Sequence, residues 1–296
     1  MHDLFGRHDP GPGHPERPAR YGAVESAVDR ASGLRVEAPA ASREAIERVH
    51  APAYLDVLEQ VSELGGGALD PDTVLSEASW QAALHAAGGA IAAVDRVLDD
   101  PSQAAFSFGR PPGHHACPAR AMGFCLINSA AVAAAHARTE HGVERVAVLD
   151  WDAHHGNGTQ DIFYGDGSVL YVSLHQAPFY PGSGAAGERG EGAGEGATVN
   201  VPLAAGTSQD QYLTAFREQA LPALRAFEPG LVIVSAGFDA HHRDPLCSLG
   251  LDQQGFAAMV TELREPAGGP ALVLEGGYDL TALEESVVSV LEAVNR

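Results

Sequence analysis

Ionisable side chains are concentrated in segment 148–157, VLDWDAHHGN, at the end of a hydrophobic run. Residues two apart in an extended chain lie on the same side, so Asp150, Asp152 and His154 could face one wall of a crevice. Two carboxylates and one imidazole suit a borderline divalent ion. If Asp239 joins from a neighbouring strand, Asp152, His154 and Asp239 leave positions open for water and substrate, which is typical of catalytic zinc sites. Ferrous iron would fit the same ligands.

A metal with an open position polarises a carbonyl and lowers the pKa of bound water. Such a site still needs a base for the water proton, an acid for the leaving group and a donor for the oxyanion. His114 and His115 follow a stiff PPG segment, and Tyr278 follows the glycine pair of EGG. These three residues are of the required types. Together with the metal ligands they predict metal-assisted hydrolysis of an amide.

The chain alternates apolar runs with segments of helical periodicity. Helices are predicted at 42–60, 76–99, 126–141, 208–227, 253–264 and 280–295. Parallel strands of a covered sheet are predicted at 104–108, 145–151, 168–175, 231–237 and 271–277. The fold class is therefore α/β.

The candidate functional residues follow four of these strands. Ligands bind beyond the carboxyl ends of parallel strands, so the four groups should converge on one crevice. Taken singly, each motif has a structural explanation, because a strand-end Asp often caps a helix and a loop His often lies at the surface. Four such strand ends together favour a functional site.

Composition narrows the class of protein. A chain of 296 residues with 45% apolar content can bury a large core, and we expect one domain over 1–296. Three cysteines without a regular framework, and no leader or membrane-spanning run, predict a cytoplasmic protein. The net charge of −21 argues against a nucleic-acid partner. The oligomeric state stays open.

Seven segments resemble the histone deacetylase superfamily, in order and over nearly the whole chain. The similarity is strongest to the class II branch and its bacterial relatives, the deacetylase-like and acetylpolyamine amidohydrolases. The segments are HPERPARY (14–21), RPPGHHA (110–116), GFCLINSAAVAA (123–134), VLDWDAHHGNGTQDIF (148–163), YVSLHQAPFYPGSG (171–184), SAGFDAHHRDPL (235–246) and LEGGYDL (274–280).

The resemblance implies the three-layer arginase/deacetylase fold, with a largely parallel eight-stranded sheet and zinc at the strand ends. Asp152, His154 and Asp239 would be its ligands. His114 and His115 would be the tandem pair, the second acting as base and then acid, and Tyr278 would hold the carbonyl oxygen. Asp150 would orient His114, and Asn157 would orient His115 without stabilising its cation.

The resemblance also implies residues around the substrate and a second cation. Gly123, Phe124 and Tyr180 would line a narrow tunnel for an acyl-lysine-like arm, with Leu246 also at the substrate, and Arg20 would stand behind the metal to help acetate leave. A structural monovalent cation, K⁺, would bind the backbone around Asp150, Asp152, His154, Ser173 and Leu174.

Two departures from the family pattern bear on these expectations. The apolar strand that usually precedes the HDPGPGHPERP region is almost missing, which affects the first sheet position. Polyamine-selective class II members carry an acidic residue where this chain has Leu246, although bacterial acetylpolyamine enzymes place their acidic residues elsewhere. An acetylated lysine peptide or protein, an acetylated polyamine or other small amine, and longer acyl chains all stay open as substrates.

Two other classes of protein are weaker alternatives. An arginase-like manganese hydrolase would want a carboxylate two residues after the histidine of its DxHxD motif, where this chain has Gly156. A non-catalytic acyl-lysine reader would lack a ligand, a histidine or the tyrosine. All of them are present.

Overall fold

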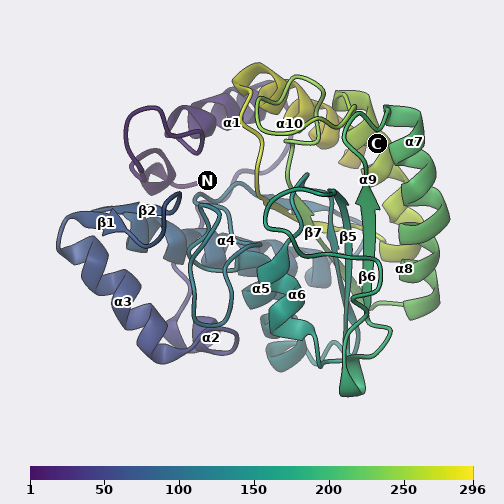
Figure 1. Ribbon diagram of the computed structural model, residues 1–296, viewed down its shortest axis with the longest axis horizontal. Helices are drawn as coiled ribbons and strands as arrows, with labels where there is room; N and C mark the ends of the chain where they lie inside the picture. The colour runs from purple at the N-terminus through teal and green to yellow at the C-terminus, as the bar shows by residue number, and fades with distance from the viewer. Residues whose placement is uncertain (296) are drawn as a thin grey trace.

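The computed structural model describes residues 1–295, with the backbone alone at 265–267, and is built on a six-stranded parallel sheet (Figure 1). Its middle strands are buried along their whole length, which explains their continuous apolar runs. In spatial order the strands are β3 (Ala105–Ser107), β8 (Ala271–Leu274), β7 (Leu231–Ala236), β4 (Val146–Asp150), β5 (Val169–Gln176) and β6 (Thr198–Leu203).

Helices cover both faces of the sheet, giving three layers (Figure 1). Alternate residues of each strand point to opposite faces, so Leu149 and Val148 belong to different hydrophobic clusters. The Leu149 face packs against α1 (Ala19–Arg30), α7 (Gln209–Ala215), α8 (Leu221–Phe227), α9 (Gln253–Ala267) and α10 (Leu280–Val294). The Val148 face packs against α4 (Ser79–Asp99), α5 (Ser129–Glu140) and α6 (Asn157–Phe163).

Smaller elements surround these layers. Helices α2 (Arg43–Glu47) and α3 (Pro52–Glu63) lie outside α4 and α5, and β1 (Gly66–Ala68) pairs with β2 (Val74–Ser76) as an antiparallel hairpin. Short 3₁₀ turns occur at η1 (Asp3–Gly6) and η2 (Gly192–Gly194), and a π-helical segment, η3 (Phe216–Ala220), joins α7 to α8. Within the described chain, no helix is both long and apolar enough to cross a bilayer.

The predicted α/β class is confirmed, with differences in detail. Over residues 1–295 the main sheet has six strands rather than eight. The first residues form η1 instead of a strand, as the short apolar start of the sequence suggested. The helix expected at 42–60 is divided into α2 and α3, and Pro52 stands at the first turn of the second helix, where its missing N–H does no harm. The elements α1, α6 and β6 were not predicted.

The order of the strands explains why the predicted residues meet. The four strands that precede the candidate residues, β3, β8, β7 and β4, are consecutive neighbours in the sheet. All run parallel, so their carboxyl ends lie along one edge. The loops after these strands therefore open onto the same region.

Candidate active site

Asp152, His154 and Asp239 lie together and are buried. Nδ1 of His154 is 3.0 Å from Oδ1 of Asp152 and 3.1 Å from Oδ2 of Asp239. Burial and the charge of Asp152 raise the pKa of Asp239 to about 7. Burial lowers the pKa of His154, but its bonds to the two carboxylates outweigh burial and raise it to about 10. Two buried carboxylates beside one imidazole favour a cation, and this donor set fits a borderline divalent ion.

Backbone N–H groups fix the orientation of both carboxylates. Gly276 N donates to Oδ2 of Asp152 at 2.8 Å, and Ala153 N donates to Oδ1 of Asp239 at 2.7 Å. A side chain at position 276 would overlap these carboxylates, so only glycine lets the backbone approach this closely. The trio is thus held from three strands, β4, β7 and β8.

The two histidines of the RPPGHH loop lie beside this trio. Nδ1 of His114 is 2.9 Å from Oδ2 of Asp150, and Nδ1 of His115 is 2.8 Å from Oδ1 of Asn157. Burial would lower the pKa of His114, but the charges of Asp150 and Asp152 raise it well above its ordinary value. Burial and the neighbouring His114 hold the pKa of His115 well below its ordinary value. The pair therefore combines a cationic and a neutral imidazole.

Tyr278 follows β8 and is 8% exposed. Its backbone N–H donates to Oδ2 of Asp244 at 2.7 Å, and the Arg20 guanidinium carbon lies 5.0 Å from the centroid of its ring. Burial raises the pKa of the Tyr278 phenol well above its ordinary value, against the opposing effect of Arg20. The hydroxyl therefore stays protonated and can donate a hydrogen bond.

Arg20 supports the loop that carries Tyr278. It is completely buried, and it donates to the carbonyls of Gly277 at 2.7 Å and Glu275 at 2.6 Å. Its third partner is Oε1 of Glu16, at 2.8 Å. These hydrogen bonds fix the backbone of the EGGY segment (275–278), which carries Tyr278.

Aromatic rings lie around the histidines and the tyrosine. The ring of Phe124 is 5.8 Å from that of Tyr278, and the ring of Tyr180 is 5.2 Å from that of His115, both nearly perpendicular. Gly123 has φ of 56°, and a Cβ there would overlap the His115 ring. Phe179, which was not predicted from the sequence, stacks on His154, with the two ring centroids 5.0 Å apart.

Leu246 lies in the loop between β7 and α9, and the residues expected at the monovalent-cation site lie in and directly after β4 and in β5. Leu246 is half-buried, and its N–H donates to Oδ1 of Asp244, the residue that also binds the backbone of Tyr278. Asp150 stands opposite Ser173 in the register of β4 and β5. The carbonyl of Leu174, the residue after Ser173, accepts a hydrogen bond from the Tyr212 hydroxyl at 3.3 Å.

Two buried carboxylates near the site were not singled out from the sequence. Glu275 accepts from the backbone N–H groups of Gly113 and His114, and Asp244 anchors Tyr278. Burial raises the pKa of Glu275 to about 7. Both lie in segments that resemble the family, Glu275 in LEGGYDL directly after β8 and Asp244 in SAGFDAHHRDPL eight residues after the end of β7, so these segments were the available signal.

His155, the neighbour of His154, points elsewhere. Its Nδ1 is 2.8 Å from Oγ of Ser183, and its Nε2 is 2.9 Å from Oε1 of Gln160. The two adjacent histidines therefore have separate surroundings, and only His154 faces the carboxylates.

Comparison with known proteins agrees with this arrangement. The histone deacetylase domain family matches residues 14–294. A histone deacetylase-like amidohydrolase from Pseudomonas aeruginosa is 43% identical, covering 96% of this chain and 77% of its own. An acetylpolyamine aminohydrolase from Burkholderia pseudomallei has a TM-score of 0.89 at 32% identity, covering 100% of this chain and 97% of its own.

A second solved structure, the HDA15 HD domain, has a TM-score of 0.95 at 37% identity and covers 99% of this chain and 89% of its own. These matches extend over the entire sheet and the loops that carry the buried trio, the histidine pair and the tyrosine. The chain belongs to the histone deacetylase family.

Proposed function

We propose that the protein is a metal-dependent amidohydrolase that removes acetyl groups from lysine side chains or similar primary amines. The observation that carries this proposal is the meeting of a buried Asp/His/Asp trio with a neutral imidazole and a protonated phenol. The first can hold a divalent ion, the second can accept a proton, and the third can donate to a carbonyl oxygen. Amide hydrolysis needs these three functions together.

Asp152, His154 and Asp239 would hold the ion, Zn²⁺ or Fe²⁺. When bound, such an ion acts as a Lewis acid that polarises an acyl carbonyl and increases the acidity of a neighbouring water. The two carboxylates neutralise its charge, and their bonds to Gly276 N and Ala153 N keep them aligned. Manganese hydrolysis of the arginase kind stays the weaker alternative, because position 156 is glycine.

His115 is the residue suited to accept the water proton. Its Nδ1–H donates to Asn157, which leaves Nε2 as the acceptor, and its lowered pKa keeps the ring neutral. After accepting the proton, the same ring can pass it to the departing amine nitrogen. His114, cationic and bonded to Asp150, contributes positive charge beside the reacting carbonyl.

Tyr278 would donate its O–H to the carbonyl oxygen as negative charge develops there. Because the phenol pKa is raised, the proton stays on the hydroxyl and is available for this bond. Arg20 and Asp244 fix the ring and the backbone of Tyr278, so the donor needs little reorganisation during the reaction.

The surrounding residues favour a slender acyl-amine arm. Phe124, Tyr180 and Gly123 would flank its methylene groups, and Leu246 would contact the substrate beyond them. Arg20 would assist the departure of acetate. The backbone around Asp150, Asp152, His154, Ser173 and Leu174 would hold K⁺ and stiffen the strand ends.

A specific observation favours a polyamine as the second candidate substrate. Burial raises the pKa of Tyr180, and the negative charges of Asp72 and Asp70 raise it further, so both carboxylates influence this residue of the expected substrate region. Asp72 also contacts this region through its carbonyl, 3.0 Å from Nε2 of His14, whose ring lies 4.6 Å from that of Phe124. An acetylated polyamine keeps cationic nitrogens that these carboxylates would attract.

The test is release of free amine from an acetyl-lysine peptide, acetylputrescine and acetylspermidine, using metal-loaded and chelator-stripped protein in parallel. We expect metal-dependent turnover of at least one of them. Failure of the loaded protein on all three would overturn the proposed activity in favour of a different acyl group or a non-catalytic reader.

Asp72→Asn distinguishes the two substrate classes, with Asp56→Asn on the exposed surface of α3 as a charge-matched control. If polyamines are the substrates, Asp72→Asn raises KM for acetylspermidine and leaves KM for the peptide nearly unchanged. Equal effects on both substrates would favour the lysine peptide.

A further inference from the structure

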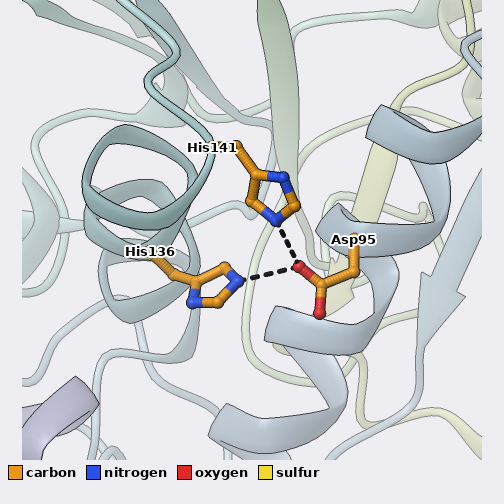
Figure 2. Close-up of side chains that lie close together, drawn as sticks. All are labelled: Asp95, His136 and His141. Atoms are coloured by element: carbon orange, nitrogen blue, oxygen red, sulfur yellow. Dashed lines mark hydrogen bonds and ion pairs between the residues drawn. The ribbon is translucent and has the colours of Figure 1, made fainter.

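A second cluster of metal-ligating side chains lies where α4 meets α5. Figure 2 shows the imidazoles of His136 and His141 directed at the carboxylate of Asp95. Nε2 of each ring is 2.8 Å from the same oxygen, Oδ1. One ligand atom from each residue lies within 4.8 Å of the other two. We name these three residues the α4–α5 cluster.

The α4–α5 cluster is separate from the catalytic residues. Helix α5 begins beside the histidine loop, where the Asn128 side chain donates to the carbonyl of Ala116. The cluster is at the other end of this helix, since His141 directly follows its last residue. At 1.5 Å per residue, the 12 residues of α5 place the two ends about 18 Å apart.

The residue types suit a borderline transition ion. Zinc binds imidazole nitrogen and carboxylate oxygen at about 2.0–2.2 Å, so tetrahedral ligands lie roughly 3.3 Å from one another. The nitrogen–oxygen separations of 2.8 Å are close to this value. The side chains of His136, Asp95 and His141 are 15%, 42% and 32% exposed, so they have room to widen by the remaining few tenths of an ångström. Imidazole ligands favour such an ion over Mg²⁺ or Ca²⁺.

Two features of the surroundings also favour a cation. Asp95 is in the last turns of α4, and His136 and His141 are at the end of α5, where the helix dipole attracts positive charge. The cluster also borders a surface pocket of about 690 Å³, to which Asp99 contributes a further carboxylate, whereas the carboxylate of Glu140 is paired with Arg48. An ion therefore has access from solvent and room for water at its open positions.

We propose that Asp95, His136 and His141 form a second, peripheral site for Zn²⁺ or a similar borderline divalent ion, linking α4 to α5. Because the ligands come from two helices, the bound ion stabilises the packing of this part of the fold. It has no contact with the acyl substrate. The alternative is a metal-free cluster in which the rings simply donate hydrogen bonds to Asp95.

The experiment counts the ions. Protein with its catalytic site loaded is dialysed against buffered micromolar Zn²⁺, and bound zinc per chain is measured by elemental analysis. We expect two ions per chain in the wild type and one in both Asp95→Asn and the double variant His136→Gln/His141→Gln. The control is Asp99→Asn, which makes the same charge change in the same helix and pocket and should keep two ions.

Thermal unfolding gives a second readout that does not depend on catalysis. Zinc beyond the first equivalent should raise the Tm of the wild type and of Asp99→Asn, with no effect on Asp95→Asn. Deacetylation of the peptide should be the same in all of them, which shows that they are folded. One ion in the wild type, or two in Asp95→Asn, would overturn the proposal, and the single variant decides if the double variant does not fold.

Discussion

The buried Asp/His/Asp trio and the α4–α5 cluster contain similar residues in opposite environments. Asp152, His154 and Asp239 are nearly inaccessible, whereas Asp95 and His141 are partly exposed. Backbone N–H groups of two loops orient the catalytic carboxylates, but the outer cluster is held by its own side chains and two helix ends. Similar types of ligand therefore do not imply the same function. Burial and neighbouring proton donors and acceptors support a catalytic role for the buried trio alone.

Removing a carboxylate from each cluster should give the largest contrast. Asp239→Ala is expected to lose the catalytic metal and all measurable turnover, because two ligands cannot hold the ion against water. Asp95→Ala should retain both the catalytic metal and turnover. Metal content and amine release measured on the same samples provide the comparison.

Asp239→Asn is the control for folding, since its amide oxygen can still accept from Ala153 N. Circular dichroism should show both Asp239 variants folded. Substantial turnover by Asp239→Ala would contradict its assignment as a ligand, and loss of turnover in Asp95→Ala would show that the two regions are functionally coupled.

Removing the hydrogen-bond donor of Tyr278, while keeping all the proposed metal ligands, should reduce turnover less than the loss of Asp239. Tyr278→Phe keeps the ring that packs against Arg20 and Phe124 but deletes the hydroxyl. We expect kcat to fall by about 10²–10³-fold, the scale for loss of one oxyanion donor. Bound catalytic metal should be unchanged. Full activity in this variant would exclude the hydroxyl as a donor to the reacting carbonyl.

A buried imidazole outside both clusters tests the effect of burial alone. Nδ1 of His50 donates to the carbonyl of Cys117, and its Nε2 accepts from Asn128 N, so the native structure requires the neutral ring. Burial lowers its pKa to about 4, against about 6.5 in the unfolded chain. As the pH falls, His50 is therefore protonated in the unfolded chain before it is protonated in the folded protein. Its contribution to the free energy of unfolding is fully present above pH 6.5 and is lost as the pH falls towards 4.

This loss should amount to about 3 kcal/mol in the free energy of unfolding between pH 7 and pH 4. The His50→Gln variant should lack this contribution to the pH dependence of the unfolding free energy, because glutamine does not titrate in this range. Its amide can replace one of the two hydrogen bonds. Denaturant titrations of both proteins across this range, with the catalytic metal saturating, measure the difference. Parallel pH dependences would show that His50 is not the group responsible.

Much of the site could be predicted because its residues follow strands directly. Asp152, Asp239 and Tyr278 come just after β4, β7 and β8, and parallel strands bring their carboxyl ends to one edge. The same rule could have identified Glu275, which directly follows β8, but not Asp244, which comes eight residues after the end of β7. It could not identify Phe179, since contact with the His154 ring depends on the path of a loop after β5.

Some elements of the fold could not be predicted from the periodicity of apolar residues. Helix α6 begins in the motif segment at Asn157, and its seven residues are too few to show a helical repeat. Strand β6 includes Pro202 and lies at an edge of the sheet, where a missing N–H is tolerated. The family resemblance implied an eight-stranded sheet, but the apolar run that usually forms the first strand is almost missing from this sequence, and residues 3–6 form η1 instead.

The sequence by itself determined the α/β class and the chemical types that follow the strands, because side-chain periodicity and the residues after each apolar run are local properties of the chain. Only the tertiary structure showed that His155, the neighbour of His154, turns to Ser183 and Gln160. It alone also brought Asp95 to His136 and His141, since they meet through the packing of α4 on α5. Contacts between distant segments depend on how whole faces pack, and no local pattern records that.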